Sequence, residues 1–258
     1  MSIYKRIVIK VGSAVLTQNN KIAKDRMLNL VDFIVKLKEK SEVILVTSGA
    51  VAAGYDALSI DNANAISKKA IAATGQPILF ASYKRKFDLH CINTAQILLT
   101  EEDFDSRRRT KIFQEIINTL LANNIVPIVN ENDVTATPDQ IFGDNDQLSA
   151  QLAHATKADL LVILSDIDGY YNENPKTHPD AKILKEVSEI SYEALNDDHS
   201  ANNAFATGGI VTKLKAANFL MKKGEKMFLC NGFDLAAAKS FLFDDVHTQG
   251  TIFFSKNS

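Results

Sequence analysis

Short apolar runs alternate along the chain with longer stretches in which apolar residues recur every three or four positions. The short runs are rich in β-branched residues and span residues 7–9, 43–46, 91–99, 125–129, 160–164 and 227–230. The periodic stretches, which predict helices, span residues 27–38, 112–121, 148–155 and 214–221. Strands that are apolar on both faces are typical of parallel sheets covered by helices on both sides. The pattern therefore predicts an α/β fold, in which an open, mostly parallel sheet is sandwiched between helix layers.

The composition is that of an ordinary globular protein. Of the 258 residues, 46% are hydrophobic and 23% are charged, which excludes a disordered chain, a collagen and a disulfide scaffold. No linker or internal repeat interrupts the pattern, so we expect residues 1–258 to form a single domain. The 29 basic and 31 acidic residues give a net charge of −2. Nucleic acids and anionic membranes are therefore not expected as partners.

Nothing in the sequence predicts export from the cytoplasm. Charges at Lys5, Arg6 and Lys10 interrupt the apolar N-terminal run, unlike the core of a signal peptide. No stretch reaches the roughly 18 apolar residues that a membrane-spanning helix needs. Cys91 and Cys230 lie far apart in the sequence, without the spacing of a metal or redox motif. We therefore expect a reduced cytoplasmic protein.

Small, polar or charged residues follow four of the apolar runs. In open α/β sheets, chemistry collects beyond the carboxyl ends of the strands. A turn at any one strand end would account for one such segment, but four together indicate a site. The segments are Lys10-Val-Gly-Ser-Ala, Thr47-Ser-Gly-Ala, Asn130-Glu-Asn-Asp and Ser165-Asp-Ile-Asp-Gly.

Several of these segments are suited to bind an anion. Lys10 ends a buried strand just before Gly12, where backbone N–H groups can approach a ligand closely. Ser48-Gly-Ala opens one helical run, and Thr207-Gly-Gly opens another that carries Lys213 one turn in. The alternatives are a lysine that snorkels along its strand and a serine that only caps a helix. Neither the P-loop motif nor Gly-x-Gly-x-x-Gly occurs, so the pattern predicts phosphate binding by another route.

Acidic residues surround the same strand ends. Asp144 and Asp146 precede the helix at 148–155. One side chain is enough to cap a helix, so at least one of these carboxylates is free for another role. With Glu131 and Asp133 they are expected to form an acidic cluster, suited to Mg²⁺ or to a substrate ammonium.

Other chemistry-bearing residues are interpreted as structural. His154 is expected to be a partly buried histidine, and the basic runs 84–86 and 107–109 to be solvated helix faces. Residues 135–141 and 170–182 are polar and turn-rich, so we expect loops or hairpins there. The residues alone predict a nucleotide or a phosphorylated ligand and indicate no particular substrate.

Eight motifs resemble the amino acid kinase superfamily and, within it, the glutamate 5-kinases. They occur in the family's order and cover nearly the whole chain. The motifs are Ile9-Lys-Val-Gly-Ser-Ala-Val-Leu-Thr17, Val46-Thr-Ser-Gly-Ala-Val-Ala-Ala-Gly54, Thr74-Gly-Gln-Pro77, Gln96-Ile-Leu-Leu-Thr100, Pro127-Ile-Val-Asn-Glu-Asn-Asp133, Gly143-Asp-Asn-Asp146, Ser165-Asp-Ile-Asp-Gly-Tyr-Tyr171 and Thr207-Gly-Gly-Ile-Val-Thr-Lys213. The chain differs from the family's usual residues at Ser165, Asn174 and Ala206, all on the nucleotide side. It also ends before the C-terminal PUA domain that many members carry.

The resemblance implies the amino acid kinase fold and ATP-dependent phosphorylation of the γ-carboxylate of L-glutamate, the first step of proline biosynthesis. It implies that Lys10, Lys213 and Asp146 are catalytic, with Asp146 orienting the lysines. It implies glutamate binding in the N-terminal part by Ser48, Gly49, Asp133 and Asn145. It implies ATP binding, mainly in the C-terminal part, by Lys10, Gly12, Ser165, Asp166, Thr207, Gly208, Gly209, Ile210, Val211, Thr212 and Lys213.

The resemblance further implies Mg²⁺ held mainly by the ATP phosphates, with no metal site built by the protein. A homo-oligomer is expected, because the apolar helical stretch 63–81 is longer than one core face needs. Transfer of the product to glutamyl phosphate reductase is a further implied partnership.

Two alternatives remain open. One is a related kinase for aspartate, N-acetylglutamate or a nucleoside monophosphate, which the acidic residues near the site disfavour. The other is a catalytically silent nucleotide sensor, which the presence of Lys10, Lys213 and Asp146 disfavours.

Overall fold

A computed structural model describes residues 4–19, 21–55, 57–58, 64–136, 145–175, 177–196 and 208–256. Its centre is an eight-stranded sheet in the order β5-β6-β4-β1-β7-β9-β10-β8. The strands are β1 (Arg6–Val11), β4 (Glu42–Val46), β5 (Thr94–Leu99), β6 (Val126–Glu131), β7 (Leu160–Ser165), β8 (Glu186–Val187), β9 (Met227–Asn231) and β10 (Thr251–Phe253). All neighbouring pairs are parallel except β9 and β10. The predicted open, mostly parallel sheet is therefore confirmed.

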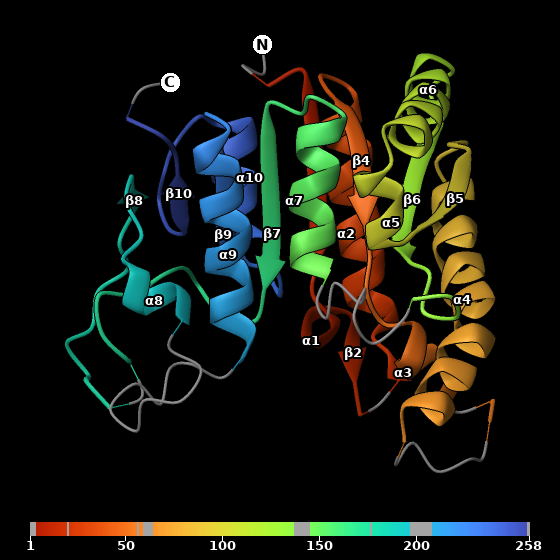
Figure 1. Cartoon of the computed structure of the whole chain (residues 1–258), viewed down its shortest axis with the longest axis horizontal. Helices are drawn as coiled ribbons and strands as arrows, with labels where there is room; N and C mark the ends of the chain where they lie inside the picture. Colours follow the sequence, from red (N-terminus) through yellow and green to blue (C-terminus); the bar gives the residue numbers. More distant parts are fainter. Residues whose placement is uncertain are drawn as a thin grey trace.

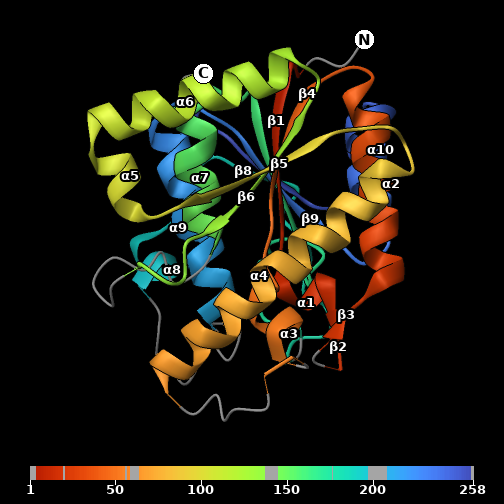
Figure 2. The ribbon, with the colours of Figure 1, turned by 90° about the vertical axis from the view of Figure 1, so that its right-hand side faces the viewer.

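Helices cover both faces of the sheet (Figures 1 and 2). One face carries α2 (Lys24–Lys38), α4 (Ala65–Asp88) and α10 (Ala236–Phe243). The other carries α5 (Glu101–Asp105), α6 (Arg107–Ala122), α7 (Asn145–Ala155) and α9 (Gly208–Lys222). The short helices are α1 (Ser13–Leu16), α3 (Ala50–Tyr55) and α8 (Tyr192–Asn196), and β2 (Thr17–Gln18) pairs with β3 (Lys21–Ile22).

Side chains of the central strands alternate between two apolar cores. On β1, Ile7 and Ile9 pack on the side of α2 and α4, whereas Val8 packs on the side of α7 and α9. Because the side-chain period of a strand is two, Lys10 shares the face of Val8. The strand pattern therefore directs this lysine toward α7 and α9.

Two predicted elements differ from the structure. The run 91–99 was expected to be a buried strand, but β5 begins at Thr94 and forms the edge of the sheet, where Gln96 and Leu98 are exposed. An edge strand has a neighbour on one side only, so its apolar sequence is half-covered. The run 125–129 ends two residues later than predicted, so Asn130 and Glu131 belong to β6 rather than to the loop after it.

The structure describes most of the predicted loop at 170–182 but only the first two residues of the one at 135–141. A hairpin-like loop at 170–182 is confirmed by the antiparallel bridge between Tyr171 and Ile183. Residues 137–141 of the other predicted loop lie outside the described residues. The basic runs 84–86 and 107–109 lie on the outer faces of α4 and α6 as predicted. Across the described ranges, no helix is long and apolar enough to cross a membrane.

Candidate active site

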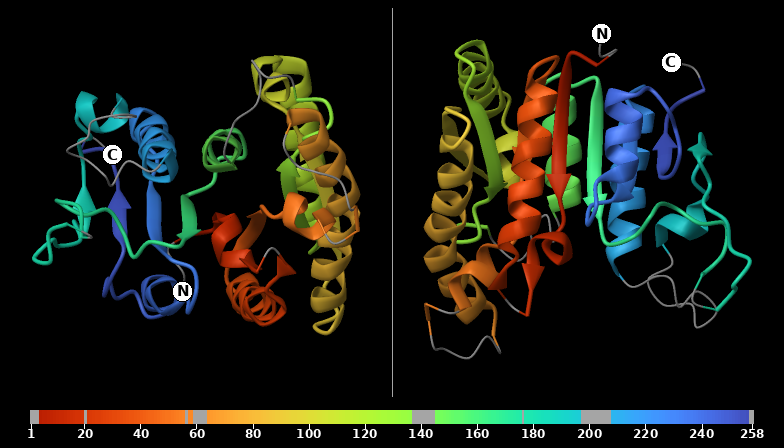
Figure 3. Two further views of the ribbon diagram at one scale, coloured as in Figure 1. Left: turned by 90° about the horizontal axis from the view of Figure 1, so that it is seen from below. Right: turned by 180° about the vertical axis from the view of Figure 1, so that it is seen from behind.

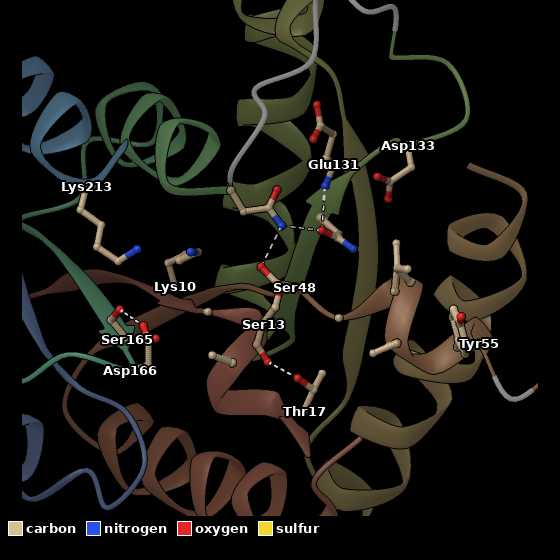
Figure 4. A pocket seen from close by; sticks show the side chains of 18 residues that line it. Lys10, Ser13, Thr17, Ser48, Tyr55, Glu131, Asp133, Ser165, Asp166 and Lys213 are labelled. Atoms are coloured by element: carbon tan, nitrogen blue, oxygen red, sulfur yellow. Dashed lines mark hydrogen bonds between the residues drawn. The ribbon is translucent and has the colours of Figure 1, made fainter. Parts of the chain in front are cut away.

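A cavity of about 630 Å³ opens at the carboxyl ends of β1, β4, β6 and β7 (Figure 4). Seen from below in Figure 3, these strand ends meet α1 and α3. The chain order along the sheet reverses around β1, because β4 lies on one side of it and β7 on the other. Ligands of open α/β sheets bind at such a switch point. The lining residues are Lys10, Gly12, Ser13, Ala14, Thr17, Ser48, Gly49, Ala50, Val51, Ala52, Tyr55, Asn130, Glu131, Asp133, Asn145, Ser165, Asp166 and Lys213.

Two lysines from distant parts of the chain meet at one buried carboxylate. The Lys10 Nζ lies 2.5 Å from Asp146 Oδ1, and the Lys213 Nζ lies 3.1 Å from Asp146 Oδ2. Lys10, Lys213 and Asp146 are 2%, 7% and 0% exposed. Charged side chains are this deeply buried only when they are paired, so the three groups hold one another in place. The lysine on β1 is therefore not the snorkelling surface residue that the sequence left open.

The N-terminal part of α9 is bound to the same carboxylate. The Thr212 hydroxyl donates to Asp146 Oδ2 at 3.1 Å, and the Lys213 ammonium also donates to the Gly209 carbonyl at 2.9 Å. Asp146 lies inside the first turn of α7 rather than before it, and its side chain points to the lysines. These contacts favour the orienting role over the capping role.

A second set of polar groups lies at the ends of β4 and β6. The Asn145 Nδ2 donates to the Thr47 carbonyl at 2.6 Å and to Asn130 Oδ1 at 2.7 Å. It also lies 3.3 Å from the Ser48 hydroxyl. Gly49 has a φ of +102°, a conformation that side chains rarely adopt, so glycine is required at this bend into α3. This part of the cavity presents hydroxyl, amide and backbone groups, which suit an amino acid substrate.

Asp133 brings a carboxylate to the same end of the cavity. It lies in the turn after β6, and burial raises its pKa above that of an ordinary aspartate. A hydrogen bond from its own backbone and the Lys69 ammonium oppose this shift. Burial removes water from the Asp133 carboxylate and makes its negative charge costly. A cationic group that entered beside it would offset this cost and favour the ionised form.

The opposite side of the cavity is formed by β1, β7 and the start of α9. Ser165 is the last residue of β7, and its hydroxyl donates to Asp166 Oδ1 at 3.0 Å. The Gly12 N–H donates to the Leu164 carbonyl at 2.9 Å, and a Cβ on Gly12 would lie 3.4 Å from that oxygen. The backbone after β1 therefore runs close against β7, and helix α1 begins directly after it.

Most residues predicted for the site are brought together. Lys10, Gly12, Ser48, Gly49, Asp133, Asn145, Ser165, Asp166 and Lys213 line the cavity, and Asp146 lies against its two lysines. Thr207 lies outside the described residues, and Gly208 is the first residue of α9. Gly209 and Thr212 belong to the N-terminal part of α9, which is bound to Asp146. Ile210 and Val211 instead bury their side chains in the core beneath α9, so only their backbone could meet a ligand.

Two further expectations were wrong. His154 is exposed rather than partly buried, since it lies on the outer side of α7 and contacts Glu225 at 2.9 Å. Asp146 does not join Glu131 and Asp133 in one acidic cluster, because α7 packs against β1 and α9 and turns that carboxylate to the lysines. Asp144 lies outside the described residues. In the part of the chain that the structure describes, no three acidic, histidine or cysteine side chains are grouped to hold a metal ion.

Some lining residues were not singled out from the sequence. Ser13, Ala14 and Thr17 come from α1 and β2, and Ala50 and Tyr55 come from α3. Ser13, Ala14 and Ala50 stood within the strand-end segments and Thr17 within a family motif, but the sequence assigned them no role. Tyr55 directly follows a family motif. Asn130 stood in a predicted segment, but its place at the end of a buried strand required the structure.

Comparison with known proteins decides the family. The model of the amino acid kinase family matches residues 5–231. The chain belongs to the amino acid kinase family. A glutamate 5-kinase of Wolinella succinogenes is 54% identical to it over 96% of this chain and 97% of its own length. One of Leishmania donovani is 51% identical over 98% of this chain and 97% of its own. These two relatives confirm the resemblance to glutamate 5-kinases that the sequence motifs indicated.

The architecture agrees with solved structures of amino acid kinase fold. A carbamate kinase from Giardia lamblia, solved with AMP-PNP, superimposes with a TM-score of 0.68 over 99% of this chain and all of its own, at 20% identity. At that identity the likeness supports the fold alone. The predicted amino acid kinase fold is thereby confirmed.

Proposed function

We propose that this chain is a glutamate 5-kinase, which transfers the γ-phosphoryl group of ATP to the γ-carboxylate of L-glutamate and begins proline biosynthesis. The observation that carries the proposal is the pair of buried lysines on Asp146, at a cavity whose other end presents Ser48, Asn145 and Asp133. One end of the cavity thus suits phosphates and the other suits a small amino acid.

The acceptor needs no general base. A γ-carboxylate with a pKa near 4.3 is ionised at neutral pH. Its oxygen attacks the γ-phosphorus, the bond from that phosphorus to the bridging oxygen breaks, and ADP leaves with the electron pair. The barrier to lower is the repulsion between two anions, which is about 4 kcal/mol for unit charges 4 Å apart at an effective dielectric of 20. Lys10 and Lys213 offset this repulsion and stabilise the transferring group, while Asp146 keeps both ammonium groups in position.

The binding residues divide between two parts of the chain. In this proposal the N-terminal part binds glutamate: Ser48 and the Gly49 backbone meet its α-carboxylate, and Asp133 and Asn145 meet its ammonium. The C-terminal part binds ATP through Ser165, Asp166 and the segment 207–213, together with Lys10 and Gly12. The end of β1 is where the two ligands meet.

Mg²⁺ fits this site as a companion of ATP. Asp166 lines the cavity on the nucleotide side, and one carboxylate together with phosphate oxygens is a donor set that Mg²⁺ accepts. Bound there, the ion would neutralise phosphate charge. The proposal further includes a cytoplasmic location, assembly with copies of the same chain, and transfer of the acyl phosphate to glutamyl phosphate reductase.

The alternatives differ in what they predict for the acceptor. A kinase for N-acetylglutamate or a nucleoside monophosphate has no ammonium to place beside Asp133. A silent nucleotide sensor has no need of two lysines on one buried carboxylate. The arrangement of this site therefore favours a kinase for a free amino acid.

The test is ADP release from MgATP with a panel of acids, together with hydroxylamine trapping of the acyl phosphate. L-Glutamate should support release and give a hydroxamate. N-Acetyl-L-glutamate should be a poor substrate because its amide cannot replace the ammonium. Equal rates with both acids would contradict the role of Asp133, and ADP release without hydroxamate would contradict an acyl phosphate product.

A further inference from the structure

One face of helix α4 carries three polar side chains at intervals of seven residues. Lys69, Gln76 and Tyr83 lie two helical turns apart from one another, so they share a face. Gln76 is 9% exposed and Tyr83 is fully buried. Tyr83 and Gln76 reach the ends of β4 and β6 respectively. Neither lines the main cavity, yet each contacts a residue next to the predicted amino acid site.

Backbone groups settle which way the amides of this network point. The Glu131 N–H donates to the Asn130 side chain at 3.0 Å, so the atom facing it must be Oδ1. The Asn130 Nδ2 therefore turns to α4 and donates to Gln76 Oε1 at 2.7 Å. At the other end, the Thr47 carbonyl accepts from Asn145 Nδ2. The acceptor on Gln76 therefore reinforces the orientation in which Asn130 Oδ1 holds Asn145.

This orientation determines what the cavity offers to a ligand. With its Nδ2 engaged by Thr47 and Asn130, Asn145 presents Oδ1 as its acceptor. An amide oxygen in this position accepts a hydrogen bond from an ammonium group. If Asn130 turned over, its Nδ2 would face the Asn145 Nδ2, and two donors would oppose each other.

Tyr83 acts on the neighbouring segment. Its hydroxyl lies 2.9 Å from the Thr47 Oγ1, which itself donates to the Ser48 carbonyl at 3.1 Å. Because the Thr47 hydrogen is used in that bond, the Tyr83 hydroxyl is the donor of the pair. Burial raises the pKa of the Tyr83 phenol, so the donor stays protonated. The bend that carries Ser48 and Gly49 is thereby tied to α4.

We propose that Gln76 and Tyr83 are positioning residues for the amino acid substrate, and that they set the orientation of Asn145 and Ser48 from beneath the cavity. This proposal rests on the proposed function, and it adds to the site two residues that touch neither substrate. The competing explanation is that both are satisfied polar groups of the core, with no effect on the substrate beyond folding.

The test compares Gln76→Met, Gln76→Glu and Tyr83→Phe with the wild-type enzyme. Met keeps the length of the side chain and removes the acceptor, whereas Glu retains an acceptor oxygen. Gln76→Met should raise the KM for glutamate about tenfold, and Tyr83→Phe about threefold, as expected for lost hydrogen bonds in a buried network. The kcat and the KM for MgATP should stay within about twofold. The KM of Gln76→Glu should lie between those of the wild type and Gln76→Met.

Thr74→Val is the matched control, because Thr74 lies on the same helix and its hydroxyl bonds only to the Ala70 carbonyl within α4 among the bonds described. Its kinetic constants should equal those of the wild type. A folded Gln76→Met with an unchanged KM for glutamate, or with equal rises in both KM values, would overturn the positioning role. If Gln76→Met does not fold, the same criteria apply to Tyr83→Phe.

Failure of the two proposals gives different results. A wild-type chain that releases no ADP with glutamate would overturn the proposed function and, with it, the positioning role. An active wild-type chain with unaffected variants would overturn only the positioning role.

Discussion

At Asp146, one side chain carries both an electrostatic and a structural task. Its oxygens hold Lys10 from β1 and Lys213 from α9, and the residue lies in the first turn of α7. Breaking a buried ion pair leaves an uncompensated charge and costs about 3–5 kcal/mol. We therefore expect a mutation at Asp146 to affect stability as well as activity.

Replacing Asp146 by Asn should show both effects. The variant keeps the shape of the side chain but leaves two buried ammonium groups without its charge. We expect kcat to fall by about 10²-fold or more, because misplaced catalytic groups cost that much. The free energy of unfolding without ligands should fall by about 3–5 kcal/mol. Steady-state kinetics and urea denaturation measure the two quantities.

The control is Asp25→Asn, which makes the same change at an exposed position in the first turn of α2. It should leave kcat unchanged and the free energy of unfolding within about 0.5 kcal/mol. An Asp146→Asn enzyme with wild-type kcat would remove Asp146 from the mechanism.

Lys69 should set the pH dependence of glutamate use through Asp133. Asp133 attracts an ammonium only when it is ionised, and burial raises its pKa. Its contribution is therefore complete above the raised pKa and is lost as the pH falls through it. The Lys69 ammonium lowers this pKa and contacts the Ala136 carbonyl. Lys69→Gln should move the acid limb of kcat/KM for glutamate to higher pH.

The measurement is the pH profile of kcat/KM for Lys69→Gln beside Lys84→Gln. Lys84 lies on the same helix and forms an exposed ion pair with Asp88, so its loss should not move the limb. An acid limb at the same pH in Lys69→Gln and the wild type would show that Lys69 does not act on Asp133.

At the scale of elements, helix α3 lies unusually close to α4. A Cβ on Gly54 would lie 2.0 Å from the Ile71 carbonyl oxygen, and one on Gly75 would lie 1.8 Å from the Ala50 carbonyl oxygen. The two backbones therefore touch, and no side chain fits between them. Since Ala50, Val51 and Ala52 line the cavity, this contact sets the position of one wall.

Gly75→Ala should separate the two helices. The added methyl group forces the backbones apart, and overpacking of this kind costs about 1–3 kcal/mol. We expect a loss of unfolding free energy in that range and a rise in the KM for glutamate, with the KM for MgATP little changed. Ala73→Ser, at an exposed position on the same helix, should change neither. A Gly75→Ala variant as stable as the wild type would contradict the close contact.

At the scale of the whole molecule, the residues predicted to bind glutamate and those predicted to bind ATP lie on different sides of β1 in the sheet. The strands β4, β5 and β6, with α3 and α4, form the side with Ser48 and Asp133, and β7, β9 and α9 form the side with Ser165 and Lys213. The outer border of the first side is an edge strand with an exposed Leu98, and α4 beside it exposes Ile66 and Ile78. Uncovered edges and apolar residues of this kind are typical of surfaces that meet another chain.

We expect a homo-oligomer that uses this border. Leu98→Lys combined with Ile78→Asp should shift the sedimentation coefficient from that of an oligomer to that of a monomer, because charge enters an apolar contact. Tyr192→Lys is the control, since Tyr192 is 76% exposed on α8 at the opposite border of the sheet. A wild-type chain that sediments as a monomer would contradict this expectation.

The amino-acid sequence by itself determined the layers and the location of the chemistry. Buried parallel strands must be apolar on both faces, so the strands around β1 were recognisable from their residues. Small and charged residues are tolerated only where such strands end, which located Lys10, Ser48 and Ser165. The motifs then sufficed to relate the chain to its family, because they combine several strand ends in one order.

Only the tertiary structure decided which side chains meet. Asp146 was as plausible a cap or a member of an acidic cluster, until the packing of α7 against β1 and α9 turned it to two lysines. Ile210 and Val211 belong to a glycine-rich phosphate motif, yet the helical period turns them into the core. Gln76 stood in one of the family motifs, but nothing in the sequence indicated its contact with Asn130, 54 positions away. Local pattern specifies elements and their faces, whereas contacts between distant elements depend on how the whole sheet and its helices pack.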